Sequence, residues 1–360
     1  MTDRGWQGWS ESAGALVDAH DAVLLDLDGV VYVGEHAVDG AVAAIDEVRR
    51  RGVGVAFVTN NAARTPDDVA EHLRRLGVDA APADVVTSAQ AAASLLREQL
   101  EAGAAVLSIG ARGLAEALVE VGLRPVGSMD DEPLAVVQGF SPDLSWPMLL
   151  EACVAIRAGL PWVATNLDAT LPTARGPAPG NGAFVEVVRR TTGVDPQVAG
   201  KPFRPLMDAS VQRLRAERGL VVGDRLDTDL EGARRAGLPG LLVLTGVTDA
   251  GTLLGARPEE RPDFLAADLG GLLEPHPGVR AESGGWVADD GTTLRAVLDE
   301  NGDLHLSGEP AAPGESGRRV ALAAVRLACA ALWSSQPSAD RVQQARRALR
   351  PWTVVQGWDG

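Results

Sequence analysis

Four carboxylates follow two short apolar runs of the sequence. Asp26 and Asp28 close the first run, and Asp224 and Asp229 follow the second. A short apolar run that ends in acidic residues is typical of a strand buried in a parallel sheet. Because open parallel sheets bind ligands beyond the carboxyl ends of their strands, we expect these carboxylates to share one crevice.

Carboxylates that share a crevice repel one another unless a cation neutralises them. The five histidines and two cysteines of the chain are scattered, so only oxygen ligands stand near the acidic residues. Oxygen ligands favour Mg²⁺ over zinc. The sequence therefore predicts a Mg²⁺ site among these carboxylates, with Asp227 in a supporting or loop-capping role.

A hydroxyl, an amide and a lysine complete the candidate chemistry. Thr59 and Asn60 end a third apolar run, and Lys201 stands just before a predicted helix. Lys201 is the only lysine in a chain that has 33 lysine and arginine residues in total. Its compact ammonium suits an anionic group as a point charge. A carboxylate nucleophile, Mg²⁺, hydroxyl and amide donors and a lysine together predict phosphoryl transfer.

Asparagine is rare in the chain and clustered. Of the five asparagines, four lie in two short segments, at positions 60 and 61 and at positions 166 and 181. We expect a chain that otherwise avoids this residue to use it where site chemistry or a left-handed turn requires it.

Alternating strands and helices position these side chains. The first series has expected strands at 23–27, 53–58 and 85–87, and expected helices at 39–51, 89–100 and from a cap at Thr65 or Asp67 to residue 76. Such alternation predicts a parallel sheet with helices on both faces. A second series starts near Val106, and the first resumes at about Pro205, which predicts an α/β domain interrupted by another α/β module.

The same patterns predict the strands and helices of the second series and of the resumed first series. The second series has expected strands near 106 and at 135–137 and 162–164, helices at 114–121 and 148–158, and a long loop at 171–182 that is rich in glycine and proline. The resumed series has expected helices at 205–218 and 229–236 and strands at 219–222, 241–244 and 264–266.

Four segments result from these patterns. We predict a first part of the core at 1–90, an inserted module at 91–191, a second part of the core at 192–272 and a small α+β extension at 275–360. In the extension, expected strands at 286–288 and 304–306 accompany Asp-Gly and Asn-Gly turns, a strong hairpin signal, and two helices follow. An acetyltransferase-like domain is the alternative, but the extension is too short for a complete one, and we expect a non-catalytic module.

Composition excludes several classes of partner. The 49 acidic and 33 basic residues give a net charge of −16, which disfavours nucleic acid and anionic membranes as partners. Two distant cysteines argue against a disulfide framework and for a reducing compartment. The first 20 residues lack a signal-peptide pattern, and no apolar stretch approaches the roughly 18 residues of a membrane span. We therefore expect a cytoplasmic protein.

Four ordered motifs resemble those of haloacid dehalogenase superfamily phosphatases. They are DLDGVVYVG at 26–34, VTNN at 58–61, GKP at 200–202 and GDRLDTD at 223–229. The doubled asparagine and the long insertion between the second and third motifs are similar to the nitrophenylphosphatase-like subclass, IIA, with its type II cap. The resemblance covers about residues 20 to 270 and implies a Rossmann-like core, with the segment 91–191 as the cap.

The resemblance implies roles for the core residues. Asp26 would be the nucleophile and carry a phosphoaspartyl intermediate, and Asp28 would be the general acid and base. Thr59 would hold phosphoryl oxygens, and Lys201 would offset charge on Asp26 and on the transferring group. The implied Mg²⁺ ligands are Asp26, the backbone carbonyl of Asp28 and Asp224, with Asp229 supporting them.

The resemblance also implies substrate contacts. In the core these are Gly29, Asn60, Asn61 and Lys201, and in the cap they are Asn166, Asp168 and Arg175. The alternative for the cap is that Asp168 shapes a turn and that Arg175 is simply solvated.

The expected substrate is a small phosphorylated metabolite. Glycerol 3-phosphate is our first choice, with phosphoglycolate or a broad nitrophenylphosphatase-like range as the alternative. A phosphate-binding protein without catalysis and a dehalogenase are the rival classes, and the acid/base Asp28 with the metal carboxylates favours ester cleavage over dehalogenation. A homo-oligomer formed through the cap stays open.

Overall fold

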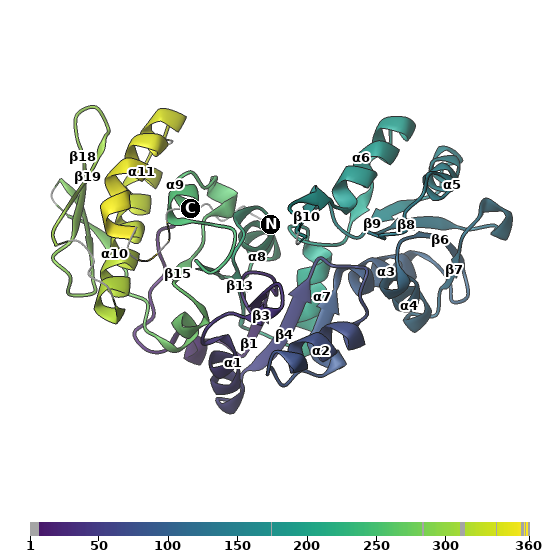
Figure 1. The fold of residues 1–360 in the computed structure, drawn as a ribbon, viewed down its shortest axis with the longest axis horizontal. Helices are drawn as coiled ribbons and strands as arrows, with labels where there is room; N and C mark the ends of the chain where they lie inside the picture. Colours follow the sequence, from purple (N-terminus) through teal and green to yellow (C-terminus); the bar gives the residue numbers. More distant parts are fainter. Residues whose placement is uncertain are drawn as a thin grey trace. The chain divides into compact units, whose positions relative to one another are not determined.

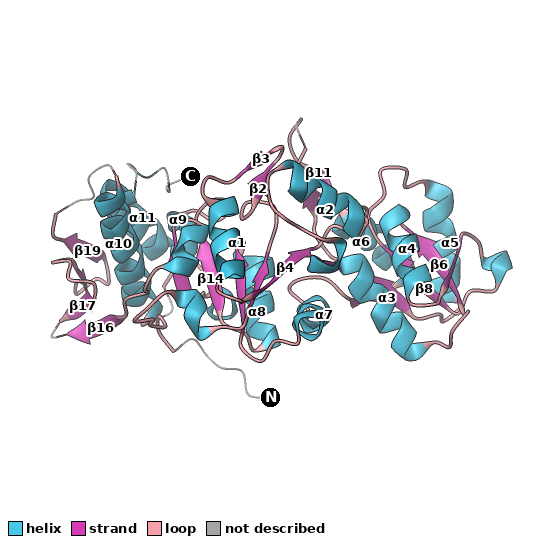
Figure 2. Ribbon diagram, turned by 90° about the horizontal axis from the view of Figure 1, so that it is seen from below, coloured by secondary structure: helices cyan, strands magenta, loops and turns pink. Residues whose placement is uncertain are grey.

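The computed structural model describes residues 7–173, 175–282, 284–309, 314–335, 337–353, 356 and 358. The chain forms two compact units, one made of residues 1–55 with 216–360 and the other of residues 56–215. Both units combine strands with covering helices (Figures 1 and 2). The predicted α/β class with parallel sheets is confirmed.

A parallel sheet carries the carboxylates of the first unit. Its strands there are β1 (Ala22–Leu25), β13 (Gly219–Gly223), β14 (Gly240–Val243) and β15 (Phe264–Ala266). Every residue of these four strands is buried, as expected for a parallel sheet covered on both faces. β1 pairs with β13 so that Leu25 lies beside Val222, which sets the acidic residues after the two strands in register.

Two further strands, β4 (Gly54–Thr59) and β5 (Val85–Thr87), pair in parallel. The complete strand order is β15-β14-β13-β1-β4-β5, and the division between the two units falls inside β4. The three strands predicted for the first series and the three predicted for the resumed series are therefore confirmed.

One of the helices around this sheet begins where a capping residue predicts. Thr65, one of the two candidate caps, starts α2 (Pro66–Arg75): its side chain accepts from the backbone N–H of Asp68, and the Asp68 carboxylate accepts from the N–H of Thr65. The other helices are α1 (Ala41–Arg50), α3 (Ser88–Gln99), α7 (Arg204–Leu214), α8 (Glu231–Ala236) and α9 (Ala250–Leu254). Within the described part of the chain, no helix has the length and apolar character needed to cross a membrane.

A second parallel sheet, in the order β12-β9-β8-β6-β7, lies in the second unit. Its elements are β6 (Ala105–Ile109), α4 (Arg112–Glu120), β7 (Arg124–Val126), β8 (Ala135–Gln138), α5 (Trp146–Arg157), β9 (Trp162–Ala164), α6 (Asn181–Thr192) and β12 (Gln197–Val198). This is the predicted inserted α/β module. β7 escaped prediction because it includes a proline, which argues against a strand, and β12 because it has only two residues. The predicted loop contains a minimal hairpin of β10 (Thr170–Leu171) and β11 (Ala178–Pro179).

Four antiparallel strands and two helices form the extension. They are β16 (Val279–Glu282), β17 (Gly285–Ala288), β18 (Arg295–Leu298), β19 (Leu304–Ser307), α10 (Glu315–Trp333) and α11 (Ala339–Thr353). The two predicted strands and both helices are confirmed. β16 escaped prediction because it is largely exposed and charged, and β18 was not predicted either.

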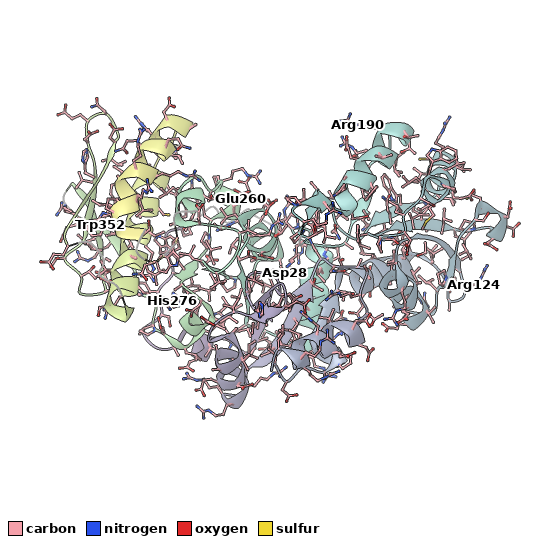
Figure 3. The ribbon with its side chains drawn as sticks, in the orientation of Figure 1. Asp28, Arg124, Arg190, Glu260, His276 and Trp352 are labelled. Atoms are coloured by element: carbon pink, nitrogen blue, oxygen red, sulfur yellow. The ribbon has the colours of Figure 1, made fainter. Side chains whose placement is uncertain are left out.

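Buried indoles join the extension to the rest of the first unit. Trp9 donates from Nε1 to the carbonyl of Arg326 at 2.9 Å, and Trp333 donates to the carbonyl of Leu254 in α9 at 3.1 Å. Trp352 of α11 belongs to the same apolar cluster (Figure 3). Since each buried indole N–H of Trp9 and Trp333 has a partner, the hydrogen bond offsets the cost of removing that N–H from water.

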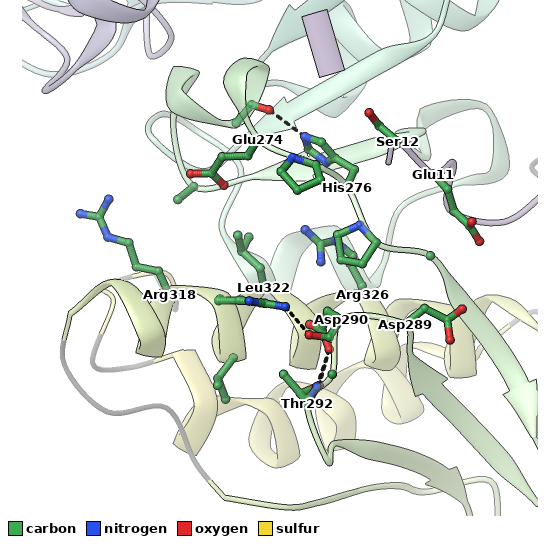
Figure 4. Close-up of a pocket in the computed structure, with 18 of the residues that line it drawn as sticks. Glu11, Ser12, Glu274, His276, Asp289, Asp290, Thr292, Arg318, Leu322 and Arg326 are labelled. Atoms are coloured by element: carbon green, nitrogen blue, oxygen red, sulfur yellow. Dashed lines mark hydrogen bonds between the residues drawn. The ribbon is translucent and has the colours of Figure 1, made fainter. Parts of the chain in front are cut away.

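A cavity of about 1370 Å³ lies where the extension meets the preceding loop (Figure 4). Its lining includes Glu11, Asp268, His276, Asp290, Arg318 and Arg326. His276 is only 3% exposed, and its Nε2 lies 2.8 Å from the carbonyl oxygen of Gly271, which can only accept, so Nε2 carries the proton. Burial lowers the pKa of His276 to about 4, so this imidazole is neutral at pH 7.

The neutral state of His276 makes stability depend on pH. An unfolded histidine has a pKa of about 6.5, so between pH 6.5 and pH 4 the unfolded chain binds a proton that the folded chain does not. The free energy of unfolding should therefore fall by about 3 kcal/mol as the pH drops through this window. We expect His276→Gln to cost more stability at pH 7 than at pH 4.5 in urea unfolding. The exposed control His36→Gln should show no such difference, and an equal cost of His276→Gln at both pH values would refute the assignment.

Candidate active site

Three carboxylates of the first unit converge at the ends of its strands. Asp26 follows β1 and donates its backbone N–H to Val222 of β13 at 2.9 Å. Asp224 follows β13, and Asp229 lies in a π-helical turn formed by residues 226–230. One carboxylate oxygen from each of the three lies within 4.8 Å of the others, with Asp224 and Asp229 buried and Asp26 half-buried. The predicted convergence of these three residues is therefore present in the structure.

Glycines make room for the Asp224 carboxylate. A Cβ atom at Gly246 would overlap the carboxylate, and one at Gly29 would lie 2.5 Å from its Oδ2. Gly29 has φ +83°, a conformation that glycine adopts readily. The N–H of Val247 donates to Asp224 Oδ2 at 2.6 Å, so the loop after β14 fixes the direction of this carboxylate. The sequence reading missed Gly246 because nothing nearby in the chain marks it.

Asp229 is held by the turn in which it lies. Its Oδ2 accepts from the backbone N–H of Arg225 at 3.1 Å, and a Cβ atom at Gly223 would overlap its side chain. Asp227 differs: its side chain is 57% exposed and forms an ion pair with Arg225 at 2.9 Å. The expectation that Asp227 shapes the loop instead of joining the carboxylates agrees with this placement.

The donor set of this group fits Mg²⁺. All three side chains offer carboxylate oxygens, which are hard ligands, and two of them are buried. A divalent cation would also offset the repulsion among three close negative charges. Asp28 is exposed and forms an isolated β-bridge with Tyr32, next to the Gly29 N–H, which donates to the carbonyl of Tyr32 at 2.8 Å.

The second unit holds the predicted hydroxyl and lysine. Thr59 ends β4, is 6% exposed, and accepts from the N–H of Asn61 at 3.0 Å. Lys201 is 4% exposed, and its Nζ donates to the carbonyl of Val58 at 3.3 Å. The side chain of Asn61 accepts from the N–H of Ala63 and so shapes the turn after β4. Thr59 and Lys201 are thus both tied to the carboxyl end of β4.

The predicted cap residues separate into two groups. Asn166 donates to the carbonyl of Asn60 at 2.7 Å, and Asp168 accepts from the Asn60 side chain at 3.1 Å. Asn181, the fourth asparagine of the two clusters, donates to the carbonyl of Asn166 at 2.8 Å. Arg175 is exposed, and its N–H donates to the hydroxyl of Thr173 within a turn. Asn166 and Asp168 therefore join the end of β4, whereas no contact of the Arg175 side chain with them is present among the described residues.

Comparison with known proteins identifies the family. Residues 23–124 match the model described as haloacid dehalogenase-like hydrolase, and residues 198–272 match the model described as HAD-hydrolase-like. D-glycerol 3-phosphate phosphatase of Mycobacterium tuberculosis is 44% identical over 359 residues, which span 95% of this chain and 96% of the relative. The chain belongs to the haloacid dehalogenase-like hydrolase family. Its fold is accordingly the Rossmann-like α/β fold of these HAD-like hydrolases, with further sheets in the inserted module and the extension.

Other relatives of this HAD-like hydrolase are phosphatases too. Acid sugar phosphatase of Staphylococcus aureus is 39% identical over 64% of this chain and 88% of its own. A crystal structure of the M. tuberculosis glycerol phosphate phosphatase with magnesium matches at a TM-score of 0.82 and 42% identity, covering 95% of this chain and 99% of that one. A thermostable NPPase of Geobacillus stearothermophilus matches at 0.64 and 34% identity, covering 70% and 97%. The predicted subclass is thereby supported.

Gly246 offers a test of the carboxylate group in this HAD-like hydrolase. The added methyl of Gly246→Ala would force the Asp224 carboxylate to move, because the Cβ would overlap it. Displacing the support of a metal ligand typically costs about 10–100-fold in metal affinity. We expect a loss of that size in Mg²⁺ affinity, measured by calorimetry on the folded variant. Gly127→Ala, whose Cβ would meet nothing within 4 Å, is the control, and unchanged affinity in Gly246→Ala would contradict the placement.

Proposed function

We propose that the chain is a Mg²⁺-dependent phosphatase that hydrolyses glycerol 3-phosphate to glycerol and phosphate. The convergence of Asp26, Asp224 and Asp229 carries the proposal, because three close carboxylates suit a divalent cation and phosphate chemistry. The family supports it, since the relatives described above are named as phosphatases and one was crystallised with magnesium.

The reaction would proceed in two displacements. An Asp26 carboxylate oxygen attacks phosphorus and forms the phosphoaspartyl bond, while the bond from phosphorus to the ester oxygen breaks and Asp28 protonates the departing alkoxide. Asp28 then takes a proton from a water molecule whose oxygen attacks phosphorus, and the bond to Asp26 breaks to release phosphate. The exposure of Asp28 is compatible with a group that must meet both the leaving alkoxide and water.

The remaining residues would bind charge that develops on the phosphoryl group. In the proposal, Thr59 and the chain at Gly29, Asn60 and Asn61 hold phosphoryl oxygens, and the Lys201 ammonium offsets their charge. Asp26, the carbonyl of Asp28 and Asp224, with Asp229 in support, would hold Mg²⁺. The cation, when bound, polarises a phosphoryl oxygen and shields Asp26 from the negative ester that it attacks.

Glycerol 3-phosphate suits the cap better than phosphoglycolate does. Asp168 is a half-buried carboxylate, which can accept hydrogen bonds from the hydroxyls of glycerol but repels the carboxylate of phosphoglycolate. Asn166 and Arg175 are the other cap residues that we propose near the leaving group. The M. tuberculosis relative named for this substrate spans nearly the whole chain, extension included, which favours the same choice.

Cellular context remains part of the proposal. Cys153 and Cys329 are both free thiols, which fits a reducing compartment, so we propose a cytoplasmic location. A homo-oligomer formed through the cap segment at 91–191 is a prediction that gel filtration with light scattering would test.

Replacement of the nucleophile tests the mechanism. Asp26→Asn keeps the size of the side chain but removes the anionic oxygen that would bond phosphorus. We expect phosphate release in the presence of Mg²⁺ to fall by more than about 1000-fold while circular dichroism shows a folded protein. Asp227→Asn, in an exposed carboxylate paired with Arg225, should retain wild-type turnover. Turnover by Asp26→Asn close to that of Asp227→Asn would contradict the nucleophile assignment.

A panel of esters tests the substrate. We expect kcat/KM for glycerol 3-phosphate to exceed that for phosphoglycolate and for p-nitrophenyl phosphate by at least about 10-fold, because the cap must distinguish hydroxyls from a carboxylate or an aryl ring. A preference for phosphoglycolate would favour the first alternative, and a flat profile would favour a broad-specificity enzyme. Hydrolysis of no ester in the panel would instead support a phosphate-binding protein without catalysis.

A further inference from the structure

The side chain of Asn60 uses its Oδ1 and both Nδ2 protons in hydrogen bonds to other protein groups. Its Oδ1 accepts from the backbone N–H of Lys201 at 2.8 Å, and its Nδ2 donates to the carbonyl of Lys201 at 3.1 Å. Nδ2 also donates to the carboxylate of Asp168, and the distance from Nδ2 to Oδ2 is 3.1 Å. One amide, half-buried at the end of β4, therefore joins two segments that lie 141 and 108 residues away in the chain.

Lys201 is held at two points by the end of β4. Its backbone is bound on both sides by the Asn60 amide, and its Nζ donates to the carbonyl of Val58. Gly200 makes this approach possible, because a Cβ atom there would lie 2.5 Å from Asn60 Oδ1. The lysine is also 4% exposed, so few other positions are open to its ammonium. The backbone anchor at Asn60 thus helps to decide where the charge of Lys201 lies.

The segment of Asp168 is equally constrained. The Asp168 N–H donates to Asn166 Oδ1 at 3.1 Å, and Asn166 in turn donates to the backbone carbonyl of Asn60 at 2.7 Å. Behind this loop, Cβ atoms at Gly180 and Gly182 would overlap the carbonyl oxygens of Asp168 and Leu167. Because these close contacts keep the loop from moving away on that side, a change at Asn60 should alter the environment of the Asp168 carboxylate.

We propose that Asn60 is a positioning residue that couples the Lys201 ammonium to the substrate-reading loop at Asp168. The inference rests on the proposed function, since it takes Lys201 to act on the phosphoryl group and Asp168 on the leaving group. The Asn60 backbone remains the part proposed to face phosphate, and the side chain has the separate task of orientation. The placement of charge and the reading of the leaving group would then depend on one amide.

Only an asparagine side chain meets the requirements at this position. One acceptor and two donors are needed at once, and an amide on a single methylene supplies them. Asn60→Asp keeps the shape, but it places a carboxylate oxygen against the carbonyl of Lys201 and against the carboxylate of Asp168. Both contacts become repulsive, so the damage should be larger than the loss of two hydrogen bonds alone.

A double-variant experiment tests the coupling. We expect Asn60→Asp to lower kcat by at least about 30-fold, for both glycerol 3-phosphate and p-nitrophenyl phosphate, because the Lys201 ammonium acts on the group common to both. Asp168→Asn alone should lower kcat/KM for glycerol 3-phosphate. In the Asn60→Asp background the same Asp168→Asn should raise kcat at least about 5-fold, since it removes the repulsion and restores a donor. Recovery is expected to be partial because the contact with the Lys201 carbonyl stays repulsive.

Controls separate this inference from the proposed function and from folding. Asn301→Asp, an exposed asparagine in the extension, should leave kcat within about 2-fold of wild type. If the thermal melt shows that Asn60→Asp is unfolded, the smaller and uncharged Asn60→Ser replaces it, with the same loss of kcat expected and no recovery on adding Asp168→Asn. An active wild type with undiminished kcat in the Asn60 variant, or no recovery in Asn60→Asp with Asp168→Asn, overturns the inference alone. A wild type without phosphatase activity overturns the proposed function instead.

Discussion

Repulsion among three carboxylates is the constraint on which the first unit is built. Asp26, Asp224 and Asp229 each bring one oxygen within 4.8 Å of the others, where two negative charges cost about 3 kcal/mol at an effective dielectric constant of 20. The protein lowers this cost with backbone N–H groups, since Val247 donates to Asp224 and Arg225 to Asp229. Such donors stabilise the ionised forms but cannot cancel three charges, so the arrangement is suited to a divalent cation.

The basic side chain at the end of β4 in the second unit is a lysine, not an arginine. The chain uses arginine almost everywhere, yet a lysine stands at position 201, where a single Nζ reaches the carbonyl of Val58 from a nearly inaccessible site. A guanidinium spreads its charge over a plane and demands several acceptors, whereas an ammonium places it at one point. A buried site at the end of a strand can hold such a point charge. This is a physical reason for a lysine at position 201.

The acidic residues at the strand ends could be predicted from local sequence patterns. The other contacts of the site join residues that are far apart in the sequence and meet only in the folded chain. Asp26 and Asp224 were identifiable because an apolar run and the acid that follows it are neighbours in sequence. Gly246 was not, because its role depends on Asp224, which packs against it only in the folded chain. Asn60 was expected near phosphate, but its side chain contacts the backbone of Lys201, which is 141 residues away, so no local pattern could predict that contact. Arg175, expected at the substrate, lies exposed in a turn.

The extension packs against β15, the last strand in the sheet order of the first unit. β15 ends the strand order of the first unit, and an uncovered edge strand exposes N–H and carbonyl groups that invite pairing with another chain. Arg326 of α10 donates to the carbonyl of Leu265 in β15 at 3.2 Å, and the surrounding apolar cluster is shared by both segments. Burial lowers the pKa of Arg326 to about 10, which leaves it charged at neutral pH and able to donate. These contacts give the extension a structural role at the edge of the sheet, and that it is non-catalytic stays a prediction.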